Sequence, residues 1–170
     1  MTPFIQRLIG AAKLDVHIYE EVEADTTAMG QAIGVVALSS VAAGIGAAGQ
    51  EVTLGLFGGL LAAFLGWLLW AGLTYFIGTR ILPTPQTHAD WSQLLRTTGF
   101  ASAPGMLRVF GIVPGLTGLI FFVSAVWMLA AFVVAVRQAL DYTSTGRAVG
   151  VCLIGWLING VIMVFLNFLS

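Results

Sequence analysis

The stretch VFGIVPGLTGLIFFVSAVWMLAAFVVAV, residues 109–136, contains no Asp, Glu, Lys or Arg and decides the fold class of this chain. A helix needs about 20 predominantly apolar residues to cross the hydrocarbon core of a bilayer, and this stretch is longer than that. Three more uncharged stretches also reach this length, residues 26–50, 52–79 and 148–170. Because lipid offers no partner for a free backbone N–H or C=O group, such segments must be helical. The sequence therefore predicts an all-α, polytopic transmembrane helix bundle.

The composition of the whole chain leads to the same class. Of its 170 residues, 58% are hydrophobic and only 9% are charged, whereas a soluble domain has about 25% charged residues. Seven basic and eight acidic side chains give a net charge of −1, which excludes the strong basic field that nucleic-acid binding requires. The single cysteine, Cys152, has no second cysteine with which to form an internal disulfide.

The segment between the second and third long stretches decides the number of spans. Pro83 and Pro85 end a helix, because proline lacks an N–H and disfavours the helical conformation in the residue before it. Asp90 is placed to cap a new helix that begins at Trp91. Residues 94–112 would then form a short third span, which Pro104 interrupts.

Positive charges near the ends of the spans favour this short third span. If residues 94–112 cross, every basic loop lies on one side of the membrane, as the positive-inside rule requires. If they do not cross, Arg137 and Arg147 are placed on the face opposite Arg7 and Lys13. We therefore expect five spans with the N-terminus inside, and a four-span arrangement is the alternative.

The first 25 residues are predicted to form an amphipathic and acidic segment before the bundle, which comprises residues 26–170. Apolar residues at helical spacing form one side of the segment, with polar ones on the other: Phe4, Ile5, Leu8, Ile9 and Ala12 against Gln6, Arg7 and Lys13. This helix either lies in the headgroup region or packs against the cytoplasmic ends of the spans. The acidic residues Glu20, Glu21, Glu23 and Asp25 follow. They form either a solvated helix entry or a docking surface for a basic partner or for arginines of the inside loops.

The residues that carry chemistry are few. No Asp, Glu or His lies within a long uncharged stretch, and neither H-E-x-x-H nor G-x-S-x-G occurs. His17 and His88 are far apart in sequence from each other and from Cys152, so no cluster of zinc ligands is expected. We expect a protein that is not an enzyme and holds no cofactor.

Arg108 is the most informative single charge. A guanidinium at membrane depth costs at least ~2.5 kcal/mol on insertion scales unless it snorkels or pairs. It is either a snorkelling interfacial arginine, a member of an ion pair with Glu51, or a contact for a lipid headgroup.

Small residues recur four positions apart, a spacing that lets helix backbones approach closely in lipid. The pairs are Gly30 with Gly34, Ser40 with Gly44, Gly55 with Gly59, Gly111 with Gly115, and Gly146 with Gly150. Asn159 is a candidate for an interhelical hydrogen bond. Together these residues predict a tightly packed bundle, with one face left for another protein.

Two functions follow from these patterns. The first is a non-enzymatic accessory or assembly subunit that binds other integral membrane proteins, with membrane lipids around it and no nucleic acid. The alternative is a small transporter or lipid-handling protein that uses the broken segment at residues 97–115, where irregular backbone at membrane depth often lines a cavity.

The order of elements resembles the Yip1 family of multi-pass membrane proteins, from about Leu14 to the C-terminus. The resemblance is carried by four stretches: Tyr19-Glu20-Glu21-Val22-Glu23, residues 98–104 (TGFASAP), Val126-Trp127, and residues 143–149 (TSTGRAV). It implies five helices with a cytosolic N-terminus. The chain is similar to compact prokaryotic members, which implies a place in the cytoplasmic (inner) membrane and an accessory role. Eukaryotic members assist vesicle traffic and bind lipidated small GTPases, but the Asp-Leu-x-Gly-Pro motif associated with that role does not occur here.

Overall fold

The computed structural model of the 170-residue chain describes the backbone of residues 3–48 and 55–169, and the side chains of residues 3–48 and 58–158. The regular structure of these residues is helical, which confirms the all-α prediction. Three of the described helices are long and apolar enough to cross a membrane, over Thr26–Gly46, Gly58–Ile81 and Thr117–Ala139.

These three segments correspond to the helices α3, α4 and α6. The first, α3 (Met29–Gly46), follows a single 3-10 turn, η1 (Thr26–Ala28). The second, α4 (Gly55–Phe76), continues as a short π-helix, η2 (Ile77–Ile81), and ends just before Pro83, as the sequence predicts. The third is α6 (Thr117–Ala139).

The broken segment before α6 consists of two short helices in sequence. The first, α5 (Trp91–Phe100), begins with the predicted cap, because the Asp90 carboxylate accepts from the backbone N–H of Ser92. After Phe100 the chain tightens into a 3-10 helix, η3 (Ala103–Ile112), with Pro104 in its first turn. Proline is tolerated there, since the N–H groups of a first helical turn have no partner within the helix.

A turn through Pro114 and Gly115 separates η3 from α6. Gly115 has a φ of +83°, a conformation that costs glycine little because it has no Cβ. Residues 109–112 therefore complete η3, and α6 begins only at Thr117. The uncharged stretch 109–136 is thus divided between η3 and α6, in agreement with the prediction that residues 94–112 belong to a separate short segment.

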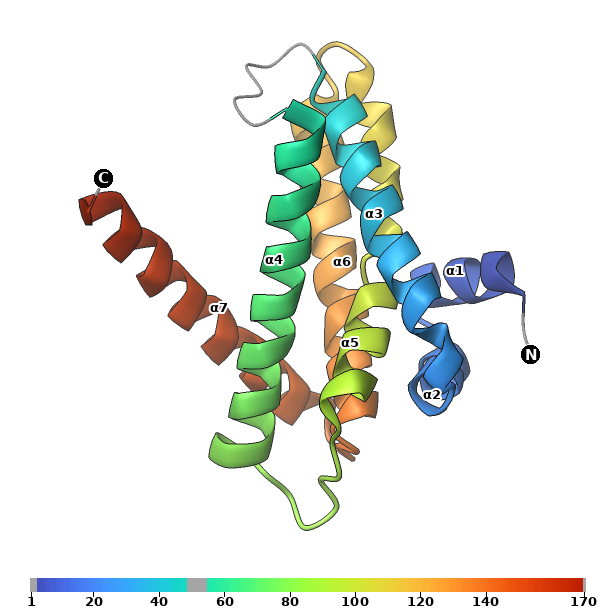
Figure 1. Ribbon diagram of the computed structural model, residues 1–170, viewed down its shortest axis with the longest axis vertical. Coiled ribbons are helices and arrows are strands. Elements are labelled where there is room, and N and C mark those ends of the chain that lie inside the picture. Colours follow the sequence, from blue (N-terminus) through green and yellow to red (C-terminus); the bar gives the residue numbers. More distant parts are fainter. Residues whose placement is uncertain (1–2, 49–54, 170) are drawn as a thin grey trace.

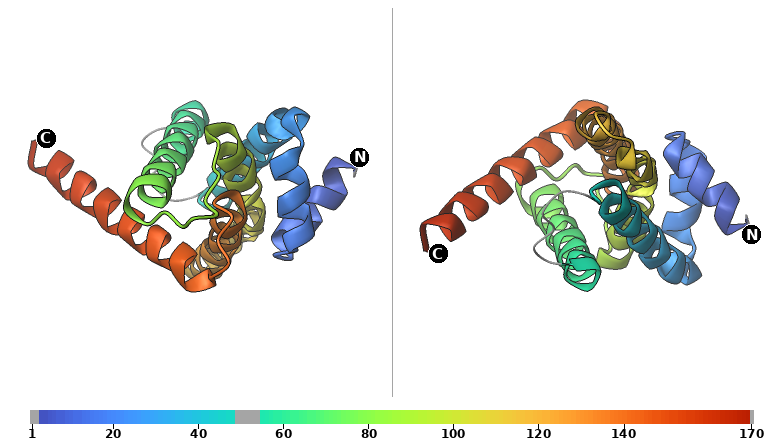
Figure 2. Two further views of the ribbon diagram at one scale, coloured as in Figure 1. Left: turned by 90° about the horizontal axis from the view of Figure 1, so that it is seen from below. Right: turned by 90° about the horizontal axis from the view of Figure 1, so that it is seen from above.

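The helices run alternately up and down in one elongated bundle (Figure 1). In that view α3 rises, α4 descends, α5 and η3 rise together between α3 and α6, and α6 descends. The last helix, α7 (Thr145–Leu169), starts beside the lower end of α6 and leans away from the other helices, as both views in Figure 2 also show.

The N-terminal helices pack on the flank of this bundle rather than beneath it (Figure 1). They are α1 (Phe4–Ala12) and α2 (Val16–Ala24), and they contact α5, η3 and α6. Trp127, in the middle of α6, donates its indole N–H to the backbone carbonyl of Ala12 at 2.7 Å. Ile5 and Ile9 remain exposed on the outer side of α1, so the helix packs on the protein and still offers apolar side chains to its surroundings.

The closest backbone approach in the bundle joins the end of α3 to η3. A Cβ built on Gly46 would lie 1.8 Å from the carbonyl oxygen of Arg108, and one on Gly105 would lie 2.0 Å from the Ser39 hydroxyl oxygen. These contacts allow the irregular η3 to lie directly against α3. Gly46 and Gly105 thus mark the tight helix contact, although spacing in the sequence does not single them out.

Of the glycines that spacing did single out, Gly111 lies at a tight contact, because a Cβ there would lie 2.9 Å from the Phe121 ring and 3.0 Å from the Gly46 carbonyl oxygen. Five others lie in more open places. A Cβ on Gly30 or Gly59 would meet no atom within 4 Å, and one on Gly34 would have Phe4 as its nearest neighbour at 4.0 Å. For Gly146 and Gly150 the nearest atoms lie at 3.5 and 3.8 Å. None of these five supports a close backbone contact within this chain, because four-residue spacing does not specify which face of a helix meets a neighbour. The surroundings of Gly55 and the side chain of Asn159 lie outside what the structure describes.

Candidate functional site

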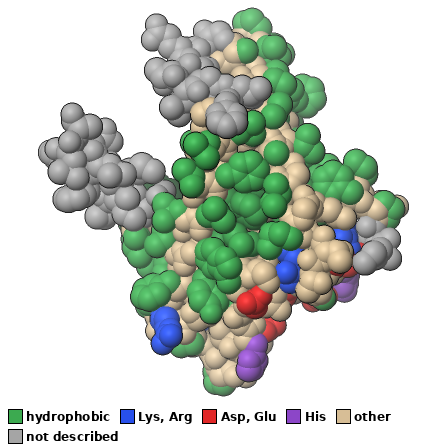
Figure 3. Space-filling model, in the orientation of Figure 1, with side chains coloured by type: hydrophobic (Ala, Val, Ile, Leu, Met, Phe, Trp, Pro, Cys, Tyr) green, Lys and Arg blue, Asp and Glu red, His purple; other side chains and the backbone are tan. Residues whose placement is uncertain are grey.

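Charged side chains gather at one end of the molecule. In the space-filling view of Figure 3, Lys, Arg, Asp, Glu and His side chains lie on the lower part of the visible face, and hydrophobic side chains cover the part above them. The charged part carries α1, α2 and the lower ends of the long helices. The molecule therefore has a polar end and an apolar body, the division expected of a protein that is partly embedded in lipid.

Arg7 is the centre of a buried ionic cluster at the polar end. Its Nη2 lies 2.8 Å from Glu21 Oε1 and 2.7 Å from Asp25 Oδ2, and its Nη1 donates to Gln31 Oε1 at 3.0 Å. Only 1% of Arg7 is exposed. The sequence predicted that Arg7 lies on the polar side of the first helix but gave no indication that this side chain is buried. A buried guanidinium is tolerated here because two carboxylates and an amide satisfy it.

Arg96 supports the C-terminal end of α2. Its Nε donates to the carbonyl oxygen of Val22 at 2.9 Å, and its Nη2 donates to that of Glu23. These carbonyls belong to the last turn of α2, where carbonyl groups have no N–H partner within the helix. This turn is also the negative end of the helix dipole. Local sequence patterns do not indicate this contact, because it joins residues more than 70 positions apart.

The acidic residues before α3 thus have different surroundings. Glu21 and Asp25 bind Arg7, and the carboxylate of Glu20 accepts from Gln138 Nε2 at 3.0 Å. Glu21 and Asp25 thus contact an arginine of the same chain, but it is Arg7 of α1 and not one of the inside-loop arginines that the sequence analysis considered. Binding of a basic partner stays a prediction.

Two of these carboxyl groups titrate away from their ordinary range. Burial raises the pKa of Glu23 to about 7, with a further increase from the nearby charge of Asp141 that Arg96 partly offsets. Hydrogen bonds from the Thr27 hydroxyl and from Arg7 lower the pKa of Asp25 to about 2. Glu23 is consequently the carboxyl group whose charge changes near neutral pH.

Arg137 and Asp141 do not form the helical pair that their four-residue spacing indicates. The helix α6 ends at Ala139, and Asp141 adopts a left-handed conformation with a φ of +51°. Arg137 instead donates to the carbonyl oxygen of Tyr142 at 3.2 Å and to the Thr145 hydroxyl at 3.3 Å. It therefore secures the turn between α6 and α7.

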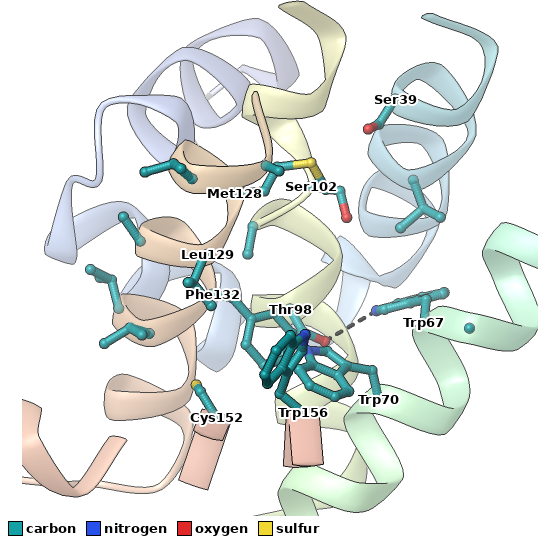
Figure 4. A pocket seen from close by; sticks show the side chains of 18 of the residues that line it. Ser39, Trp67, Trp70, Thr98, Ser102, Met128, Leu129, Phe132, Cys152 and Trp156 are labelled. Carbon is teal, nitrogen blue, oxygen red and sulfur yellow. Dashed lines mark hydrogen bonds between the residues drawn. The ribbon is translucent and has the colours of Figure 1, made fainter. Parts of the chain in front are cut away.

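A large cavity opens among α3, α4, α5, η3, α6 and α7. Its volume is about 1170 Å³, and apolar side chains make up most of its wall. Figure 4 shows the side chains of Trp67 and Trp70 from α4, Phe132 from α6 and Trp156 from α7 around it. Trp67 donates its indole N–H to the Thr98 hydroxyl at 3.1 Å.

Arg108 belongs to the wall of this cavity. The carbon at the centre of its guanidinium lies 5.7 Å from the ring centroid of Phe121, within the range of a cation–π contact. Its Nε is buried without a hydrogen-bond partner among the described residues. Glu51, which the sequence offered as an ion-pair partner, lies outside those residues.

The described part of the chain contains no cluster of metal-ligating side chains. No three His, Cys, Asp or Glu side chains come together there in a way that could hold a metal ion. Cys152 is buried in the wall of the cavity, between apolar neighbours.

The long apolar helices, the polar end and the apolar cavity define an α-helical integral membrane protein. The family model of the Yip1 domain matches residues 18–166. The chain belongs to the Yip1 family, as the resemblance indicated. No curated protein and no solved structure matches the chain.

Proposed function

We propose that this Yip1-family protein is a non-enzymatic accessory or assembly subunit that binds another integral membrane protein through the open face of α4. It crosses the membrane five times, with α5 and η3 together as the third span and the N-terminus on the cytoplasmic side. The alternating direction of the helices and the gathering of charge at the end that carries α1 and α2 support this orientation. Membership of the family agrees with a prokaryotic cytoplasmic membrane, as the compact members suggest.

The open face of α4 is the observation that carries the proposal. Gly59, Ala62 and Gly66 follow helical spacing and are all exposed, and a Cβ on either glycine would meet no atom within 4 Å. Leu65 and Leu69 border them, with 57% and 43% of their side chains exposed. A small-residue surface of this kind lets a second helix approach closely and gain van der Waals contact.

The lean of α7 keeps this part of the bundle accessible. Because α7 diverges from α4 along its length (Figures 1 and 2), the upper part of α4 has no helix of this chain against it on that side. In a bundle that had completed its own packing, we would expect small residues such as Gly59 to face a neighbouring helix. The partner therefore contributes a membrane helix that packs against the small residues of α4.

The test is cross-linking in the native membrane followed by purification in mild detergent. The double variant Gly59→Leu/Gly66→Leu fills the small-residue surface, so recovery of the neighbouring protein should fall at least fivefold. The matched control is Gly118→Leu, because Gly118 is also an exposed helical glycine with nothing within 4 Å, but on α6. Equal recovery from the double variant and the control, or purification of this chain alone, would contradict the proposal.

A second function, lipid handling, is favoured by one observation. Arg108 lies beside a cavity instead of facing only its own helix neighbours. The alternative function requires this arrangement, because a bound lipid would need both a charged group for its headgroup and an apolar space for its acyl chain.

A further inference from the structure

The packing of η3 against α6 places two unsatisfied polar groups at one level. A Cβ on Gly105 would lie 2.9 Å from Met128 Sδ, and one on Gly111 would lie 2.9 Å from the ring of Phe121. The two segments therefore run antiparallel, and Arg108, midway between these glycines, is level with Ser124, midway between Phe121 and Met128. Arg108 Nε and Ser124 Oγ are the buried side-chain polar atoms without a hydrogen-bond partner in the described part of the chain.

Such atoms point to a missing partner. Buried polar groups in native proteins are nearly always hydrogen-bonded, so each exception needs an explanation. Arg7, Arg96 and Arg137 each donate to at least one oxygen, whereas Arg108 has only the Phe121 ring beside its guanidinium. An anion with several oxygens would satisfy Arg108, and a phosphate matches the planar fork of a guanidinium particularly well.

The position of Arg108 along the bundle suits a lipid phosphate. Its backbone carbonyl lies against Gly46, the last residue of α3, so it is near the end of the bundle opposite α2. In the orientation proposed above, this end reaches the outer headgroup region. Phosphates are held there by the lipids themselves.

The cavity next to Arg108 has the dimensions of one acyl chain. On α6, Phe122, Val126, Leu129 and Val133 line it and follow helical spacing. From Phe122 to Val133 a helix rises about 16 Å at 1.5 Å per residue, which is close to half of a hydrocarbon core about 30 Å thick. The apolar wall therefore extends from Arg108 to about the depth that one lipid leaflet occupies.

We propose that Arg108 binds the phosphate of an anionic diacyl phospholipid of the outer leaflet, with one acyl chain in the cavity along α6. The net negative charge of the lipid complements a guanidinium that has no carboxylate among the described residues. Ser124 lies at about the level of Arg108 but is fully buried and outside the cavity wall, so the site rests on Arg108. The cavity wall shares Gly66 with the small-residue surface of α4, whereas Gly59 and Ala62 lie outside it. The lipid site does not require the accessory role.

The experiment measures thermal unfolding of the purified, delipidated protein in non-ionic detergent as lipids are added. Phosphatidylglycerol should raise Tm with saturation, phosphatidylcholine should raise it less, and inorganic phosphate should not raise it. In Arg108→Gln the concentration of phosphatidylglycerol needed for half of the effect should rise at least tenfold. Arg108→Lys retains the charge and should lie between the two, which keeps the test valid if Arg108→Gln does not fold.

Two further variants separate the headgroup contact from other effects. Arg147→Gln is the matched control, because Arg147 is exposed at the opposite end of the bundle, and it should respond to lipid as the unmodified protein does. Leu129→Trp places a larger side chain in the wall of the cavity while Arg108 is unchanged. This variant should weaken the response to phosphatidylglycerol. The proposal is overturned if Arg108→Gln responds normally, or if inorganic phosphate or phosphatidylcholine is as effective as phosphatidylglycerol. It is also overturned if Glu51→Gln and Arg108→Gln lower Tm equally while lipid has no effect, which would identify an internal ion pair.

Discussion

At the scale of single residues, buried charge holds the N-terminal helices in place. Arg7 joins α1 to Glu21 of α2, to Asp25 and to Gln31 of α3. Arg96 of α5 adds a second link through the carbonyls at the end of α2. These contacts add to the apolar packing of Ala11, Tyr19 and Val22, which are buried in the hydrophobic core, so the amphipathic N-terminal segment becomes part of the folded bundle.

Removal of Arg7 should therefore loosen α1 and α2. We expect Arg7→Gln to destabilise the protein by about 3–5 kcal/mol, the cost of leaving buried partners of an ion pair uncompensated. Thermal unfolding in detergent measures this loss, with Lys13→Gln as the control because Lys13 is exposed on the same segment. A Tm for Arg7→Gln equal to that of the control would show that the cluster does not contribute to stability.

Glu23 should make the stability of the protein depend on pH in a defined direction. Because burial raises its pKa from 4.5 to about 7 in the folded protein, the folded state binds more protons than the unfolded state between these values. Stability should fall as pH rises from about 4.5 to 7, since Glu23 then ionises near Asp141 and Glu20 with only Arg96 in opposition. In Glu23→Gln this part of the pH dependence should disappear from unfolding curves measured across that range. An unchanged slope would rule out Glu23 as its origin.

At the scale of elements, the irregular segment α5–η3 is the centre of the bundle. Residues 94–101 of this segment are all buried, and η3 packs against both α3 and α6. A segment broken by Pro104 can occupy this position because α3 and α6 cover its irregular backbone on both sides. Irregular backbone is tolerated at membrane depth under this condition. Gly46 and Gly105 make that cover possible by allowing close contact.

Two glycines of α3 provide a matched test of this contact. A Cβ on Gly46 would meet the Arg108 carbonyl oxygen at 1.8 Å, whereas one on Gly30 would meet nothing within 4 Å. Gly46→Ala should thus destabilise the protein by about 1–3 kcal/mol, as overpacking does. Gly30→Ala should leave stability unchanged or raise it slightly, because alanine favours a helix over glycine. Equal Tm values for the two variants in detergent would mean that α3 and η3 do not pack as closely as described.

At the scale of the whole molecule, the crossing of the third segment determines on which side every later loop lies. If α5 and η3 cross together, Gly115 lies outside and Gln86 inside. In a variant with Cys152→Ser, a cysteine at position 115 should react with a membrane-impermeant thiol reagent in intact cells. A cysteine at position 86 should react only after the membrane is opened. Reaction at position 86 in intact cells, or protection at position 115, would contradict the five-span orientation.

Much of this architecture could be predicted from local sequence features. The absence of charge over residues 26–50 and 52–79 predicted two long helices, and Pro83 and Asp90 predicted an end and a beginning. These features act over a few neighbouring residues, through backbone hydrogen bonding in lipid and through helix capping. The positions of the helices can therefore be predicted from short stretches of sequence. For the candidate site, Arg108 stood out as a charge at membrane depth, and the broken segment 97–115 suggested a cavity under the alternative function. The residues of α4, α6 and α7 that form the cavity wall could not be predicted.

The sequence alone determined that this chain is a helical membrane protein with a broken segment before residue 115 and an unusual arginine within it. Composition and proline placement are sufficient for these predictions. The apolar residues of a stretch show that its helix faces lipid, and a nearby proline shows where that helix ends. Only the tertiary structure decided that Arg7 is buried, that Gly46 and not Gly30 lies at the tight contact, and that Arg108 shares a level with Ser124. These facts depend on which helix faces meet, and residues far apart in sequence set those faces through their combined packing.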